Sequence, residues 1–336
     1  MNEDLDQTFS RLAARRPHGI AALLLPYLAS GGVDWEGFEQ LVVRTRAAGL
    51  DCAVNMDTGF GDLLSPTERR TVLETTRRSL GDGVRFYAGA YPDGQEARSA
   101  AWSRALSDIE AAGATPVIVQ SRAMHEMPPA EKASLYGEIA RASSAGALAF
   151  ELSPRFARHG EIWSDETFAR IVDIPELVGA KHSSLDRTIE LGRLATRDRI
   201  RPDWRVYTGN DLAIDMVGYG SDYLLGLATF APDRFAERDE LLERGDTAFL
   251  MANDDLQHLG NVGFRAPIPA YKHAAAQFLH LCGRLRGDGV HPSAPRRPGS
   301  ERTLLLDAAV RLALVEDDAA VHRERVEPYL DRAAAK

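Results

Sequence analysis

Eight short apolar runs, each followed by a stretch with its charges on one face, constrain the fold of this chain more than any other feature. Runs that are apolar on both faces fit strands buried in a parallel sheet. The intervening stretches have the period of amphipathic helices. The runs are Gly19–Tyr27, Cys52–Met56, Phe86–Tyr91, Pro116–Val119, Ala147–Leu152, Leu177–Ala180, Trp204–Thr208 and Tyr223–Ala228.

The stretches between these runs also carry the signals that begin and end helices. Ser65 is a predicted N-cap, Pro66 occupies the first helical position, and Glu68 lies three residues after the cap. Gly49, Gly113 and Gly146 fall where helices should end. The pattern predicts helices over Trp35–Ala48, Pro66–Leu80, Glu96–Ala112 and Ala130–Ser143.

Eight strand-helix units without a long interruption favour one closed (β/α)8 barrel, a TIM barrel of the α/β class, with a C-terminal helical extension. An open doubly wound sheet is disfavoured because the dinucleotide fingerprint G-x-G-x-x-G is absent. We expect an N-terminal arm at 1–17, the catalytic barrel at 18–245 and the extension at 246–336. The extension should contain helices over Ala270–Cys282 and Thr303–Val315, separated by an exposed loop at 287–300 whose arginines are solvated.

Composition limits the classes of partner. The chain has 40 Lys plus Arg against 49 Asp plus Glu, a formal charge of −9, which argues against binding nucleic acid. No apolar run approaches the roughly 18 residues of a membrane helix, and residues 1–17 have no apolar signal core. We therefore expect a soluble, cytoplasmic protein with no membrane partner. Cys52 and Cys282 are too far apart in sequence to suggest a metal knuckle or a disulfide framework.

Lysine is scarce, and one lysine has an unusual position. Of Lys132, Lys181, Lys272 and Lys336, only Lys181 closes a predicted strand. Chemistry in such barrels occurs at the C-terminal ends of the strands. Desolvation there lowers the pKa of an amine toward the range in which it attacks a carbonyl and forms a Schiff base. The alternative is a plain ion pair at the barrel rim, with Asp57 or Glu151 as partner.

Five partial motifs follow one another along the barrel: LPY at 25–27, DTG at 57–59 with LSPTER at 64–69, VGAK at 178–181, YTGND at 207–211 and ATFAP at 228–232. In this order they resemble motifs of the dihydrodipicolinate synthase and N-acetylneuraminate lyase family of class I aldolases, over residues 18 to about 235. The resemblance implies that Lys181 forms an imine with pyruvate or a related 2-oxo acid. It also implies that no further cofactor is needed and that the protein is a homo-oligomer, a dimer or a tetramer.

The same resemblance implies a set of substrate-binding residues. Thr58 and Gly59 would bind the carboxylate of the keto acid through hydroxyl and N–H groups, although Thr58 could simply cap a turn. Arg155 lies at the position of the family's carboxylate-binding arginine, with a solvated side chain as the alternative. His182 follows the lysine and could shape substrate choice, and Thr229 would line the floor near the eighth strand.

The chain departs from the family where protons are transferred. Phe150 stands where the proton-relay tyrosine is expected, so the usual tyrosine relay cannot operate. A class I aldolase still needs a proton shuttle. The candidates are Asp57, then Glu151, then His125, although alternation along a strand would turn Glu151 away from the lysine unless the strand ends or bulges there. Each also has a structural explanation: a turn residue, a rim salt bridge and a loop histidine.

Three functions remain open from the sequence. The first is a Schiff-base lyase acting on pyruvate, a related 2-oxo acid or a keto-deoxy sugar acid, as an aldolase or as a dehydratase. The second is a metal-dependent barrel lyase or hydrolase with His125, Glu151 and His182 as ligands, although no tight ligand spacing supports it. The third is a non-catalytic relative that binds 2-oxo acids, which the missing tyrosine suggests.

Overall fold

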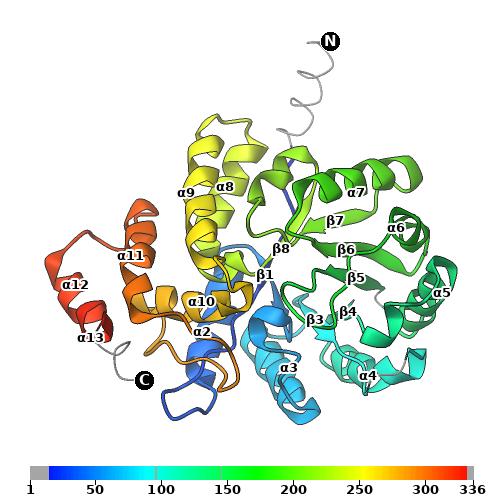
Figure 1. Ribbon diagram of the computed structural model, residues 1–336, viewed down its shortest axis with the longest axis horizontal. Coiled ribbons are helices and arrows are strands. Elements are labelled where there is room, and N and C mark those ends of the chain that lie inside the picture. Colours follow the sequence, from blue (N-terminus) through cyan, green and yellow to red (C-terminus); the bar gives the residue numbers. More distant parts are fainter. Residues whose placement is uncertain (1–14, 95–96, 145, 331–336) are drawn as a thin grey trace.

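A closed barrel of eight parallel strands forms the centre of the protein in a computed structural model, which describes residues 15–94, 97–144 and 146–330 (Figure 1). The strands follow chain order around the barrel, and β8 pairs with β1. Each lies within or overlaps one of the eight apolar runs, so the predicted fold class is confirmed. The strands are β1 (Gly19–Ala22), β2 (Asp51–Val54), β3 (Tyr87–Ala90), β4 (Thr115–Ile118), β5 (Ala147–Leu152), β6 (Leu177–Ser183), β7 (Arg205–Thr208) and β8 (Asp222–Leu225).

Helices surround the barrel, and their ends follow the capping signals. Ser65 Oγ accepts from the Glu68 N–H at 3.2 Å while Glu68 Oε2 accepts from the Ser65 N–H at 2.7 Å, which completes the predicted capping box. The helices are α2 (Trp35–Ala47), α3 (Pro66–Leu80), α4 (Ser103–Ala111), α5 (Pro129–Ala140), α6 (Asp165–Val172), α7 (Arg187–Ile200) and α8 (Pro232–Glu243). The helix expected over Glu96–Ala112 is divided, because a short 3-10 turn at Ser99–Trp102 precedes α4, and Glu96 lies outside the described residues.

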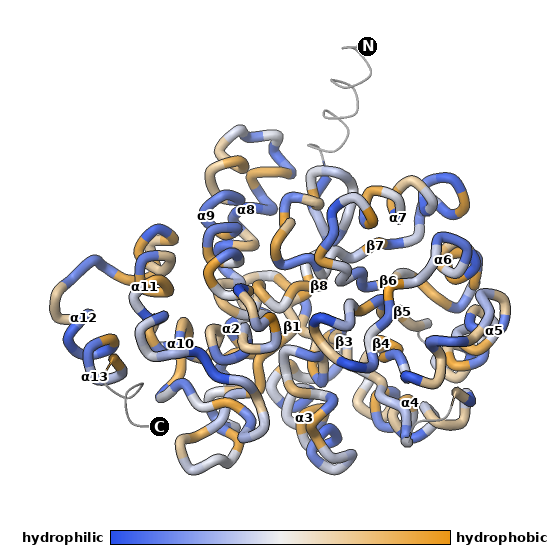
Figure 2. Tube along the Cα trace, viewed as in Figure 1, coloured by the Kyte–Doolittle hydropathy of each residue, from blue (hydrophilic) through white to orange (hydrophobic). Residues whose placement is uncertain are grey.

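The hydropathy pattern explains why the strands close into a barrel. Every residue of β2, β3, β4, β5 and β8 is buried, because one face of each strand packs inside the barrel and the other packs under helices. Figure 2 shows that hydrophilic residues are frequent along the peripheral helices, for example α7 and α12 (Ala319–Arg325). No helix in the described ranges is long and apolar enough to cross a membrane.

The C-terminal helices pack beside the barrel (Figure 1). They are α9 (Ala248–Gly263), α10 (Tyr271–Leu281), α11 (Arg302–Arg311), α12 and α13 (Glu327–Leu330), so both helices expected in the extension are present. All residues of α10 except His280 are buried, since this helix packs in the interior of the protein. The first turn of α10 thereby reaches the C-terminal ends of the strands.

The prediction of an exposed loop at 287–300 with solvated arginines is correct for Arg296, which is exposed, and wrong for Arg297. Arg297 is buried, and its guanidinium donates to the carbonyls of Gly263 and Ala266 at 3.3 and 3.1 Å. The Gly289 carbonyl accepts from the Tyr27 N–H at 3.1 Å, which ties this segment to the loop after β1. Most of the predicted N-terminal arm lies outside the described residues, and Arg15 forms an ion pair with Asp222.

Candidate active site

Lys181 lies on β6 between Phe150 of β5 and Tyr207 of β7, and its side chain is 5% exposed. Its Nζ lies 4.7 Å from the centre of the Phe150 ring. Among the ion pairs that the described residues form, none includes Lys181. Asp57 is paired with Lys272, and Glu151 is paired with Arg193. The alternative of a rim ion pair with these two carboxylates is therefore not found.

The environment changes the protonation of two facing groups. Burial lowers the pKa of Lys181 to about 8, although the charges of Asp211 and Asp57 oppose the shift. Burial raises the pKa of Asp211 to about 7, with Lys181 opposing that shift in turn. Asp211 Oδ1 accepts from the Leu227 N–H at 2.7 Å, which fixes the carboxyl group. An amine with this pKa is neutral in a substantial fraction of molecules near neutral pH.

A small cavity at the C-terminal ends of the strands opens next to Lys181. It is built by β5, β6, the segments that follow β2, β5, β7 and β8, and the start of α10. Besides Lys181 it is lined by Asp57, Thr58, Leu152, Phe156, Ser183, Gly209, Asp211, Gly226 and Tyr271. Gly209 is required for its shape. A Cβ at this position would lie 2.7 Å from Lys181 Cε and 2.0 Å from Ser183 Oγ, so any larger residue would displace the lysine.

Asp57 and Thr58 form a polar cluster with two residues of α10. Tyr271 Oη lies 2.8 Å from Asp57 Oδ2 and 2.9 Å from Thr58 Oγ1, and Lys272 Nζ donates to Asp57 Oδ1 at 2.7 Å. All four side chains are buried. The sequence did not identify Tyr271 or Lys272 as site residues, because they are more than 210 residues from their partners. The scarcity of lysine was the available signal for Lys272.

The turn after β2 leaves the Thr58 hydroxyl, but not every amide, for a ligand. The Gly59 N–H donates to the Met56 carbonyl at 3.1 Å, and the Phe60 N–H donates to the Asp57 carbonyl at 3.0 Å. The expected contribution of the Gly59 amide to carboxylate binding is therefore not available in this geometry. Thr58 lines the cavity directly.

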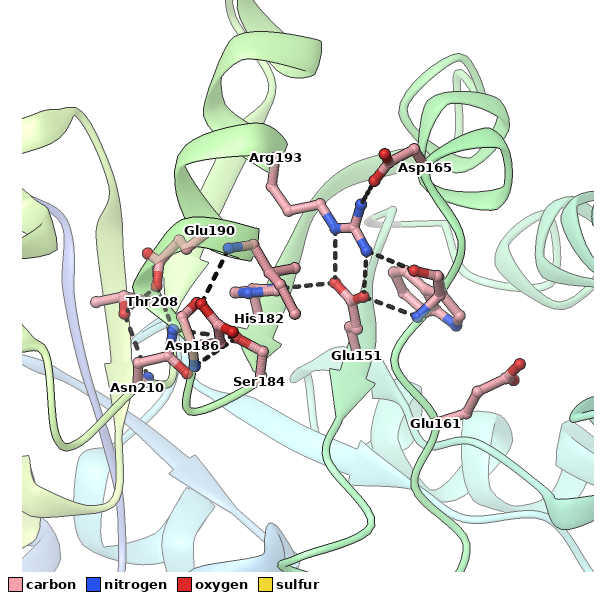
Figure 3. A network of polar contacts seen from close by, with 12 residues as sticks. Glu151, Glu161, Asp165, His182, Ser184, Asp186, Glu190, Arg193, Thr208 and Asn210 are labelled. Carbon is pink, nitrogen blue, oxygen red and sulfur yellow. Dashed lines mark hydrogen bonds and ion pairs between the residues drawn. The ribbon is translucent and has the colours of Figure 1, made fainter.

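Glu151 and His182 face away from Lys181, which corrects the expectation that they take part in proton transfer and substrate binding beside it. The register of β5 shifts only between Ala147 and Leu148, so strict alternation turns Glu151 and His182 outward while Phe150 and Lys181 point inward. Figure 3 shows Glu151 directed toward His182 and Arg193.

These two side chains belong to a buried network between the barrel and α7. Glu151 is 2.5 Å from His182 Nδ1 and 2.8 Å from Arg193 Nη2, and Arg193 also contacts Asp165 at 2.6 Å. Burial would raise the pKa of Glu151, but His182 and Arg193 hold it below its usual value. This network therefore joins β5 and β6 to the surrounding helices.

Three further predicted residues are not in the lining of the cavity. The ring of His125 lies 3.0 Å from the His159 carbonyl, in the loops after β4 and β5. Arg155 is exposed in the loop after β5. Thr229 is buried, and its hydroxyl accepts from the Leu24 N–H at 3.2 Å, which accounts for it structurally.

The positions of the possible metal ligands bear on the metal-dependent lyase or hydrolase that the sequence left open. Within residues 15–94, 97–144 and 146–330, no group of three or more His, Cys, Asp or Glu side chains is placed to hold a metal ion. His125 does not join Glu151 and His182, whose contacts are with each other and with Arg193. The ligand set suggested by the sequence is therefore not assembled.

Fold and site together define a (β/α)8 barrel protein with a buried amine in its mouth. Residues 17–284, from the start of the barrel to the end of α10, match the dihydrodipicolinate synthetase family. The chain therefore belongs to this family of enzymes, as its sequence motifs suggested.

Similar proteins cover nearly the whole barrel. The 4-hydroxy-tetrahydrodipicolinate synthase of Bartonella quintana (strain Toulouse) is 26% identical over 281 residues, which is 82% of this chain and 92% of the relative. The fold resembles that of the dihydrodipicolinate synthase from Acinetobacter baumannii complexed with pyruvate (TM-score 0.74, 20% identity, 90% of this chain, 100% of the other). It also resembles a prophage protein of the dihydrodipicolinic acid synthase family from E. coli K12 in complex with pyruvate (TM-score 0.78, 17% identity, 89% and 99%). At these identities the two structures establish the shared fold.

Proposed function

We propose that the protein is a class I lyase whose Lys181 forms a Schiff base with the keto carbon of pyruvate or a related 2-oxo acid. The observation that carries the proposal is the buried Lys181 amine in the cavity, with its pKa lowered to about 8. At pH 7 about one Lys181 in ten is then a free amine, roughly 300-fold more than for a lysine of ordinary pKa.

The imine supplies the chemistry and replaces any other cofactor. Its protonated nitrogen withdraws electrons from the substrate, so that a proton can leave C3 and an enamine can form. The enamine then makes or breaks a carbon–carbon bond, or expels a hydroxyl group. Two similar structures contain pyruvate, which supports a small 2-oxo acid as the first substrate.

We propose that two residues recognise the substrates, one at the wall of the cavity and one on an exposed loop outside it. Thr58 offers a hydroxyl at the cavity wall to the carboxylate of the 2-oxo acid, because a buried carboxylate must keep hydrogen bonds that it had in water. Arg155, exposed on the loop after β5, offers a guanidinium to an acidic group of the second substrate. We further propose a homo-oligomer, which light scattering of the purified protein tests.

Reduction with borohydride in the presence of pyruvate tests the proposal. Peptide mass mapping should find one reduced pyruvyl group on Lys181, and none on the Lys181→Met variant. Lys132→Met is the matched control, because it removes a buried lysine that pairs with Glu161 outside the cavity lining and should leave the Lys181 adduct. Absence of an adduct with pyruvate and with longer 2-oxo acids would refute the Schiff base. Binding of such an acid without an adduct would favour the non-catalytic alternative.

A further inference from the structure

Tyr271 supplies a phenol to the cavity from outside the barrel strands. It is the first residue of α10, and it lines the same cavity as Lys181. Its hydroxyl lies between Asp57 Oδ2 at 2.8 Å and Thr58 Oγ1 at 2.9 Å. A phenol has one hydrogen and can also accept, so it can donate to Asp57 while accepting from Thr58, or donate to Thr58. Such a hydroxyl can pass a proton in either direction.

The ring of Tyr271 is held in one orientation. It stacks on Phe264 with 4.3 Å between ring centres and meets Phe156 edge to face at 6.2 Å. Gly226 permits its close approach, because a Cβ there would lie 3.1 Å from Tyr271 Cε2 and 3.0 Å from Thr58 Oγ1. A group fixed in this way can transfer protons without first being ordered.

We propose that Tyr271 is the proton-transfer residue of the lysine site, taking the place of the missing strand-five tyrosine. The inference rests on the proposed Schiff base at Lys181. It names a residue of the C-terminal helices as catalytic, whereas Asp57 and Lys272 act through it as positioning residues.

Tyr271 alone can donate and accept every proton that moves during imine and enamine formation. The neutral Lys181 amine attacks the keto carbon, and the carbonyl electron pair moves to oxygen, which takes the proton of Tyr271. The phenolate then takes a proton from the nitrogen of the adduct. When the nitrogen lone pair expels the hydroxyl group, this group takes the Tyr271 proton and leaves as water. The phenolate finally removes a proton from C3 of the iminium, which gives the enamine and restores the phenol.

The neighbouring groups support this sequence of transfers. Burial, reinforced by the charge of Asp57, holds the pKa of Tyr271 well above its ordinary value, so the free enzyme has the phenol ready to donate. Lys272 donates to Asp57 and offsets part of its negative charge, which lowers the cost of the transient phenolate. The Phe150 ring that faces the lysine has no hydroxyl group and therefore no proton to transfer. Tyr271 Oη is hydrogen-bonded to Thr58 Oγ1, the hydroxyl proposed to bind the substrate carboxylate, so the phenol lies beside the site of the bound acid.

Exchange of the C3 hydrogens of pyruvate in D2O, followed by NMR, isolates the enamine step. The wild type should exchange them, and Tyr271→Phe should do so at least about 100-fold more slowly, since general acid–base groups contribute at least this much. Borohydride should still trap the imine on Lys181 in this variant after long incubation. Tyr223→Phe is the matched control, because its buried hydroxyl donates to Asp239 at 2.7 Å away from the cavity lining.

The outcomes separate the possible roles. Exchange by Tyr271→Phe within about threefold of the wild type would overturn the assignment. A purely structural role would also lower the final extent of trapping after long incubation, which would overturn it as well. Should Tyr271→Phe fail to fold, a fluorotyrosine placed at position 271 keeps the ring and lowers the phenol pKa. The pH profile of exchange must then shift, and an unchanged profile refutes the proposal. Failure of the Schiff base itself is distinct, because the wild type would then trap nothing.

Discussion

Removal of the Lys272 cation should destabilise the protein strongly, because Lys272 and Asp57 form a buried ion pair with 2.7 Å between Nζ and Oδ1. In Lys272→Met the Asp57 carboxylate stays buried and keeps only the Tyr271 hydroxyl as a side-chain donor. Breaking a buried pair from one side costs about 3–5 kcal/mol, so the free energy of unfolding in urea should fall by this amount.

Lys132→Met provides the comparison. Lys132 is equally buried, but its partner Glu161 is 22% exposed and can be solvated when the cation is removed. Its loss should therefore be clearly smaller. The double variant Lys272→Met with Asp57→Asn should recover part of the stability, with a coupling energy of about 2–3 kcal/mol. Additivity of the two single changes within about 0.5 kcal/mol would refute the argument that α10 is anchored to the active site by this pair.

Three other predictions concern separate parts of the site. Asp211→Asn removes a charge that raises the pKa of Lys181, so the pH profile of imine formation should move to lower pH; an unmoved profile would contradict the electrostatic argument. Glu151→Gln should lower the free energy of unfolding by about 3–5 kcal/mol, because Arg193 loses its buried carboxylate, yet the folded fraction should still trap pyruvate on Lys181; loss of trapping in folded protein would restore a catalytic role for Glu151. Arg155→Ala should leave trapping of pyruvate unchanged and raise the KM for the second substrate, and an unchanged KM would remove Arg155 from recognition.

The barrel was predictable because its determinants are local. A strand that is buried on both faces is apolar throughout. The start of a helix is marked in the sequence by a capping box such as that of Ser65 and Glu68. Lys181 was found in the same way, since a charged residue at the end of an apolar run is conspicuous. The doubt about Glu151 also followed from strand alternation, and the structure resolves it by showing β5 without a bulge at that point.

The missing part of the site depends on contacts between distant segments. Nothing near Tyr271 in the sequence indicates that α10 packs at the mouth of the barrel, and its hydroxyl finds Asp57 across 214 residues. Arg297 was misjudged for the same reason. Its loop composition suggested exposure, whereas the backbone carbonyls that it binds belong to the last residue of α9 and to the segment between α9 and α10. Local periodicity carries no information about such pairings.

The rate at which borohydride traps pyruvate on Lys181, measured against pH, tests the central claim most directly. With a pKa of about 8, the rate should rise about tenfold per pH unit up to that point and then level off. A rate that keeps rising beyond pH 10, as for an ordinary lysine, or an adduct that forms on Lys132 or Lys272 instead, would contradict the account.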